Sequence, residues 1–243
     1  MSQSTDRTAR LAGLLYLLVT VTGVFNLIYV PGKVLVFGDA ARTAENILAH
    51  QGLFRADMAV SVISLTLFIA VVLVLHHLFS ELGRHLALAM VVLVLVSAPL
   101  GFVSVANQMA ALVCVRGADF LAAFDPSQRN ALAMLFLDLN RHVTLISEVF
   151  WGLWLLPLGL LAWRSTFLPR LIAAWLIVNG MTYVAVAFTG MLSPAHLATV
   201  STMAMPLLFG EVALMLWLLV VGTRYRRSSV PANRPSPGAS RET

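Results

Sequence analysis

Four ionisable residues lie close together in an otherwise apolar part of the sequence: Asp138, Arg141, His142 and Glu148. At about 100° per residue of an α-helix, they fall within roughly one third of the helix circumference. Because a charged side chain is costly at membrane depth, such residues usually face the interior of a helix bundle and pair there. The spacing therefore predicts a polar cavity, to which Glu211 of the last apolar stretch could contribute.

Two interpretations of this polar face are open. In the first, it binds a ligand or exchanges protons, and Glu148, which lies near the middle of the membrane, is the most informative residue. In the second, Asp138 forms a local ion-pair cluster near the outer headgroups with Arg141 and His142, three and four residues further along. Glu148 would then bond to a neighbouring helix.

Other chemistry has less support in the sequence. The single cysteine, Cys114, excludes an internal disulfide and a cysteine metal site. The chain contains no HExxH, P-loop, GxGxxG or GxSxG motif, so we expect no metal and no other cofactor. Asn107, Gln108 and Asn179 could line a pocket, although interhelical hydrogen bonds explain them equally well.

The composition is that of an integral membrane protein. Hydrophobic residues make up 59% and charged residues 11% of the chain, whereas a soluble domain carries about 25% charged residues. The net charge of +5 comes from arginines at the ends of apolar stretches and in the tail, so we expect the lipid bilayer, and no nucleic acid, as a partner. Six stretches approach or exceed the roughly 20 residues of a membrane span: Leu11–Val30, Arg55–Phe79, Leu86–Val113, Leu132–Trp163, Leu168–Thr189 and His196–Val221.

We therefore expect an all-α, polytopic membrane protein with a six-helix transmembrane domain over residues 1–227. The Ser/Pro/Arg-rich segment 228–243 should be a disordered cytoplasmic tail. Arginines are more numerous at the N-terminus, at the turns near 80–85 and 164–170, and in the tail than on the opposite side. Because the positive side of a membrane protein is the cytoplasmic one, both termini should lie in the cytoplasm.

Prolines and capping residues predict where the spans end. Pro31 should end the first span, and a short interfacial helix should follow it along the membrane surface. Asp39 or Thr43 can cap that helix, and Gly52 can close it.

Asp125-Pro126 is a helix-start or turn signal before the fourth span. Pro99 and Pro206, inside the third and sixth spans, predict either ordinary kinks or broken helices of the kind found in some transporters.

Two segments carry a resemblance to a known family: FWGLWLLPLGLLAWRSTFLPRLIAAWLIVNGMTY, from Phe150 to Tyr183, and AENILAHQGLFR, from Ala44 to Arg55. Both resemble an uncharacterised bacterial family of six-span membrane proteins, a domain of unknown function. The resemblance implies a multi-pass protein of the bacterial cytoplasmic (inner) membrane, and it implies no activity. In the first segment, Gly152 and Gly159 should let a neighbouring helix approach closely.

Two classes of function fit these observations. The first is a non-enzymatic membrane component that binds or moves a small amphiphile or an ion, which needs a cavity with few charges. The alternative is an intramembrane enzyme acting on a lipid-soluble substrate, which needs an activated nucleophile, a metal or an acid–base pair. The absence of a catalytic motif favours the non-enzymatic class.

Overall fold

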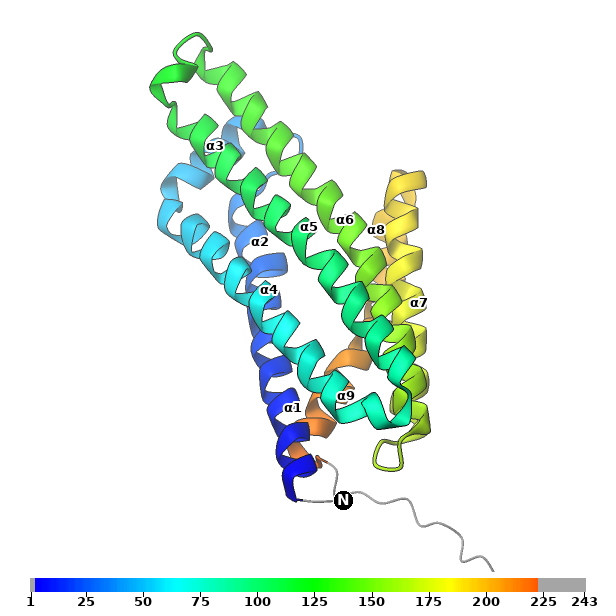
Figure 1. Cartoon of the computed structure of the whole chain (residues 1–243). Helices are drawn as coiled ribbons and strands as arrows, with labels where there is room; N and C mark the ends of the chain where they lie inside the picture. The colour runs from blue at the N-terminus through cyan, green and yellow to red at the C-terminus, as the bar shows by residue number, and fades with distance from the viewer. Residues whose placement is uncertain (1–2, 223–243) are drawn as a thin grey trace, which may run out of the picture.

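The computed structural model describes residues 3–222, which form an all-α bundle (Figure 1). Six of its helices are long and apolar enough to cross a membrane: Thr5–Val34, Gln51–Leu82, Arg84–Arg116, Pro126–Arg164, Arg170–Leu192 and Pro194–Val220. The prediction of a six-span, all-α membrane protein is confirmed. The predicted disordered tail, 228–243, lies outside the described residues.

The α-helices are numbered along the chain as α1 (Gln3–Val24), α2 (Val30–Val34), α3 (Ala40–Ala49), α4 (Gln51–Phe79), α5 (Arg84–Arg116), α6 (Pro126–Arg164), α7 (Arg170–Leu192), α8 (Leu197–Ala204) and α9 (Gly210–Val220). A π-helical turn, Phe25–Tyr29, joins α1 to α2. Short 3₁₀ turns lie at Ser80–Leu82, Asp119–Leu121, Pro194–His196 and Met205–Phe209.

Six of these helices pack in a closed ring, which we call the helix ring. Going round it, α1 contacts α4, α4 contacts α5, α5 contacts α6, α6 contacts α7, α7 contacts α9, and α9 returns to α1. The start of α1 and the end of α9 meet, since the Arg10 guanidinium donates to the backbone carbonyl of Val220 at 3.5 Å. Both ends of the described chain therefore lie at the same end of the bundle (Figure 1).

The first span does not end at Pro31. The chain stays helical to Val34 and becomes extended at Leu35, where ψ is 128°, so this prediction is wrong. The π-helical turn Phe25–Tyr29 comes just before Pro31. A proline lacks an N–H and its ring clashes with the preceding turn of a regular α-helix, and the wider turn accommodates both.

The short helix after the first span is α3, and Asp39 caps it. The Asp39 carboxylate accepts a hydrogen bond from the backbone N–H of Arg42 at 2.9 Å, whereas the Thr43 hydroxyl bonds to the backbone of Val36. Gly52 does not close α3, because α3 ends at Ala49 with His50 as its C-cap, and Gly52 already belongs to α4. That prediction is wrong, because the non-helical backbone of His50, with φ of −113°, separates α3 from α4 without a glycine.

The fourth span, α6, begins at the predicted Asp125-Pro126 signal. The Asp125 carboxylate accepts from the backbone N–H of Gln128, and the Gln128 side chain accepts from the backbone N–H of Asp125, which is a complete capping box. With 39 residues, α6 is about 58 Å long, and its first turns extend beyond the end of α7 (Figure 1). The helix is therefore longer than the apolar stretch that predicted it.

Glycines bring α6 and α7 into backbone contact, as the sequence predicted. A Cβ atom on Gly152 would collide with the backbone carbonyl of Gly180, and one on Gly159 would lie 2.6 Å from a side-chain carbon of Ile177. Neither position has room for a larger residue unless the helices separate. This contact fixes the rotation of α6 relative to α7.

The sixth span is interrupted at Pro206, so the broken-helix interpretation fits this proline. The span changes from α8 to a 3₁₀ turn, Met205–Phe209, and then to α9. Two side chains of α7 bind the carbonyls that the break leaves free: the Trp175 indole donates to Leu207 at 3.1 Å and the Asn179 amide to Leu208 at 3.2 Å. Pro99, by contrast, lies inside the uninterrupted α5.

Candidate functional site: a cavity inside the helix ring

The packed core is divided into two clusters of buried apolar side chains. The larger cluster fills the end of the bundle where α1 begins and includes Leu75, Leu158 and Leu218. The smaller cluster fills the other end and includes Ile47 and Leu137. A cavity of about 230 Å³ lies between them.

Every helix of the helix ring contributes to the cavity wall. The lining residues that matter for its chemistry are Tyr16 and Gly23 of α1, Asn26 of the π-helical turn, Ser64 and Phe68 of α4, Ser104 and Gln108 of α5, Asn140, Trp151 and Trp154 of α6, Tyr183 of α7 and Glu211 of α9. Most other parts of the wall are apolar, as at Leu65 and Val105. The wall thus combines an apolar surface with a limited number of polar groups.

Glu211 is the acid of this cavity, and the break in the sixth span places it there. It lies in the first turn of α9, where a negative charge interacts favourably with the helix dipole. The Tyr16 hydroxyl donates a hydrogen bond to the Glu211 carboxylate. Tyr183 faces the same carboxyl group from α7.

Further aromatic rings pack against Tyr16 and Tyr183, the two tyrosines that contact the Glu211 carboxylate. Trp154, 1% exposed, lies 6.2 Å from Tyr16 and 5.2 Å from Phe68 between ring centroids. Trp151 meets the ring of Tyr183 edge-on at 6.3 Å. The burial of Trp154 inside the bundle rules out a role for this residue in an interfacial aromatic belt.

The rest of the wall carries neutral polar groups that pair across helices. The Thr22 hydroxyl of α1 donates to Ser64 of α4 at 2.8 Å, and Ser104 of α5 donates to Asn140 of α6. The Gln108 amide donates to the carboxylate of Asp57 at 2.9 Å. Asp57, only 1% exposed, therefore lies behind the wall and reaches the cavity through Gln108.

Three residues of the wall hold a buried polar atom with no hydrogen-bond partner among residues 3–222. They are the amide oxygens of Asn26 and Gln108 and the indole N–H of Trp154. Leaving such an atom unsatisfied costs about 1–3 kcal/mol. All three belong to residues that line the cavity, so the polar side chains of this wall are not fully satisfied by the bundle itself.

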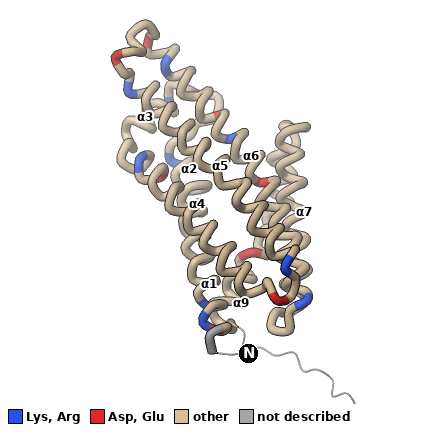
Figure 2. Tube along the Cα trace, in the orientation of Figure 1, with Lys and Arg blue, Asp and Glu red and all other residues tan. Residues whose placement is uncertain are grey.

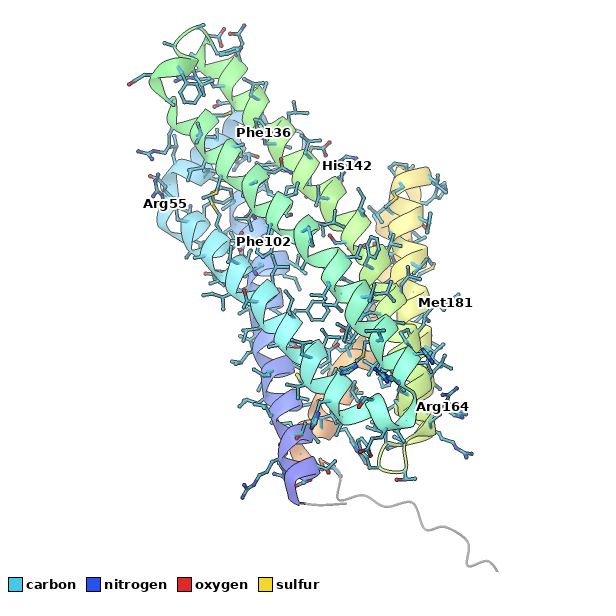
Figure 3. The ribbon with its side chains drawn as sticks, viewed as in Figure 1. Arg55, Phe102, Phe136, His142, Arg164 and Met181 are labelled. Carbon is cyan, nitrogen blue, oxygen red and sulfur yellow. The ribbon has the colours of Figure 1, made fainter. Side chains whose placement is uncertain are left out.

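The structure separates the residues that the sequence grouped on the fourth span. Arg141 Nε and His142 Nδ1 each lie 3.5 Å from a carboxylate oxygen of Asp138, and all three side chains are about half exposed. We call these three residues the Asp138 cluster. None of them lines the cavity, and His142 lies on the side of α6 away from α5 (Figure 3).

The prediction that the Asp138 cluster points into the bundle is therefore wrong, and its interpretation as a local ion-pair group describes the geometry. The cavity-facing side of α6 is a different stripe: Asn140, Thr144, Ser147, Trp151 and Trp154. These residues recur every three or four positions, so they share one face. The contact of α6 with α7 turns that face inward, and with it the Asp138 cluster outward.

Glu148 and Glu211, the other predicted site residues, have different positions. Glu211 lines the cavity as expected. Glu148 is half-buried beside it, and Tyr183 interacts electrostatically with both acids. Within the described residues, the buried oxygen of Glu148 has no hydrogen-bond partner, so the expected bond from this atom to a neighbouring helix is not formed.

Of the three amides considered in the sequence, Gln108 lines the cavity, Asn179 binds the broken sixth span, and Asn107 does not belong to the wall. Sequence reasoning missed Tyr16, Asn26, Ser64 and Asn140. The polar-aromatic stripe of α6 is a signal that could have identified part of the wall. Residues 3–222 contain no group of three His, Cys, Asp or Glu side chains placed to hold a metal ion.

Comparison with known proteins identifies a family. A family model described as "Domain of unknown function (DUF4386)" matches residues 11–222, which include every residue of the cavity wall. Neither a curated protein nor a solved structure matches the chain. The expected membership of a domain-of-unknown-function family is confirmed.

Proposed function

The chain belongs to this family of unknown function, and we propose that it is a non-enzymatic membrane component that binds a small amphiphilic molecule inside its helix ring. The observation that carries the proposal is the cavity of about 230 Å³, whose largely apolar wall holds three unsatisfied polar atoms. Pockets for drug-sized ligands measure about 300–1,000 Å³. A smaller guest with both an apolar and a polar part matches this wall.

We further propose that the protein lies in the bacterial cytoplasmic membrane with both termini in the cytoplasm. The arginines of the two turns that share an end of the bundle with the start of α1 support this orientation, since positive residues favour the cytoplasmic side. They are Arg84 on one turn and Arg164 and Arg170 on the other. Figure 2 shows Lys and Arg concentrated toward the two ends of the bundle.

The enzymatic alternative is an intramembrane enzyme acting on a lipid-soluble substrate, and the contact that would favour it is the hydrogen bond from the Tyr16 hydroxyl to the Glu211 carboxylate. The wall formed by the described residues contains no histidine, lysine or cysteine. Its serine hydroxyls at 64 and 104 contact a threonine and an asparagine, not a base. A binding or transport role requires none of these groups.

Two glycines allow a matched test of binding in the cavity. Gly23 lines the cavity and Gly52 is exposed on α4, and a Cβ atom on either would meet nothing within 4 Å. Gly23→Leu therefore fills the cavity, whereas Gly52→Leu adds the same side chain outside it. Both variants should fold.

The probe is 4-phenylbutylamine, a small amphiphile, added to protein in phosphatidylcholine nanodiscs. A ligand that binds the native state raises the unfolding temperature by an amount that grows with the logarithm of its concentration above the Kd. We expect the probe to raise the unfolding temperature of the wild type and of Gly52→Leu, and to leave Gly23→Leu unchanged. An equal rise in all three proteins would place the probe in the lipid or at another site, and would overturn the proposal.

A further inference from the structure

The acids inside the bundle have no basic partner. Within residues 3–222, neither Glu211, Glu148 nor Asp57 forms a salt bridge, and the cavity wall contains no Lys, Arg or His. A wall that holds a carboxyl group and no basic side chain favours a positively charged guest and repels an anion.

The neutral groups of the wall favour the same kind of guest. Two of the three unsatisfied atoms, the amide oxygens of Asn26 and Gln108, are hydrogen-bond acceptors. A guest that satisfies them must donate hydrogen bonds. An ammonium group donates and accepts nothing, so it complements both these amides and the Glu211 carboxylate.

The aromatic rings near Glu211 suit an organic cation. The faces of Trp, Tyr and Phe rings attract a cation within about 6 Å, and Trp154, Tyr16 and Phe68 pack together beside the carboxylate. Hard inorganic cations such as Ca²⁺ take about six to eight oxygen ligands. At Glu211 the oxygen-bearing neighbours are the hydroxyls of Tyr16 and Tyr183, which are fewer oxygens than such an ion takes.

We propose that the cavity selects a small organic cation, an amine whose ammonium group binds at Glu211 and whose hydrocarbon part lies along Phe68, Leu65 and Val105. The inference rests on the proposed binding function and specifies its ligand class. Stabilisation of the α9 dipole by a negative charge would explain why residue 211 is an acid. It does not explain the unsatisfied acceptors or the rings near the carboxylate.

Three probes with one carbon skeleton test the charge preference: 4-phenylbutylamine, 4-phenylbutanol and 4-phenylbutyrate, which are cationic, neutral and anionic at neutral pH. They are compared on the full chain in phosphatidylcholine nanodiscs, whose lipid carries no net charge. From the concentration dependence of the unfolding temperature, we expect the amine to bind at least about tenfold more tightly than the alcohol, with no measurable binding of the anion.

A pair of acid-to-amide substitutions locates this preference. Glu211→Gln should reduce the preference for the amine over the alcohol to about threefold or less, because it removes the charge that distinguishes the two probes. Asp138→Asn, the matched change in the exposed cluster, should leave the preference intact. If Glu211→Gln does not fold, the ranking of the three probes on the wild type still decides the ligand class.

The outcomes separate the two proposals. If no probe distinguishes the wild type from Gly23→Leu, the binding function itself fails. If the alcohol binds as tightly as the amine and Glu211→Gln changes neither, binding stands and the cation inference fails. The inference also fails if sodium chloride, and not the amine, raises the unfolding temperature of the wild type and loses this effect in Glu211→Gln.

Discussion

The Asp138 cluster and the Glu211 site are two solutions to placing an acid on a membrane-spanning helix. Asp138 is about half exposed and pairs with residues three and four positions along its own helix. Glu211 accepts a hydrogen bond from Tyr16, a residue 195 positions away in the sequence. The two residues meet because α1 packs against α9, the contact that closes the helix ring. The first acid is satisfied locally, and the second depends on the whole fold.

This difference shows that an acid in an apolar stretch does not by itself mark a site. The Asp138 cluster is the denser group of charges in the sequence, yet it faces away from the cavity. Glu211 is isolated in its own stretch, and it is the acid that the ring encloses. What distinguishes them is where each helix face points, which the packing of the helices decides.

The largest expected effect on stability is loss of the hydroxyl that binds Glu211. Tyr16→Phe keeps the ring beside Trp154 and removes the donor to a half-buried acid. A hydrogen bond to a charged group contributes about 1.5–3 kcal/mol, so the free energy of unfolding should fall by about that amount. Denaturation of the protein in mild detergent measures it.

Tyr29→Phe is the matched control for this substitution. Tyr29 is 49% exposed in the π-helical turn of the same span, and surface substitutions usually change stability by less than about 0.5 kcal/mol. Equal stability of the two variants would show that Tyr16 and Glu211 are not coupled. Glu211 would then not depend on a residue distant in the sequence, and the contrast with Asp138 would no longer hold.

The sequence predicted those features of the fold that depend on neighbouring residues. Hydropathy located the six spans, and Asp39 and Asp125 cap the helices that they were expected to cap. Their partners are three residues away, within reach of any local pattern.

Features that depend on distant residues were predicted less well. Pro31 was expected to end a helix, but the π-helical turn before it accommodates the proline ring, and the chain stays helical to Val34. The proline-linked break in the sixth span remained one of two interpretations, because Trp175 and Asn179 of another helix stabilise it. For the site, the sequence named Gln108 and Glu211 but misplaced the Asp138 cluster, since helix rotation is a property of the bundle.

A smaller effect is expected when the Asp138 cluster is dissected. In a double-mutant cycle of Asp138→Asn and Arg141→Gln, the coupling energy should be about 0.2–1 kcal/mol, because half-exposed ion pairs gain little from their charges. Unfolding of the four proteins in detergent provides the cycle. A coupling energy of about 3 kcal/mol or more would mean that the pair is buried, for instance in an oligomer. Asp138 would then depend, like Glu211, on contacts beyond its own helix.

The smallest effect concerns Asp125, an acid that lies outside the spans and is held by the backbone. The N–H of Gln128 donates to its carboxylate at 2.9 Å, and this bond lowers the pKa of Asp125 from its ordinary value of 3.8. A carboxyl group with a lowered pKa in the folded state stabilises that state above its unfolded pKa. This contribution disappears as the pH falls through the lower, folded pKa.

The start of α6 should therefore fray in acid, and Asp125→Asn should remove this pH dependence. Asparagine is also a good N-cap. The first turn of α6 should therefore be as stable in the variant as in the wild type at pH near 7, and more stable in the variant below the folded pKa of Asp125. The readout is the ratio of amide hydrogen-exchange rates, variant over wild type, for residues 127–130 at each pH, since intrinsic exchange cancels in the ratio. A ratio independent of pH would mean that the cap does not depend on the Asp125 charge. With the expected ratio, the three acids form a series: Asp125 depends on donors in the first turn of the helix that it caps, Asp138 on side chains of its own helix, and Glu211 on a ring of six helices.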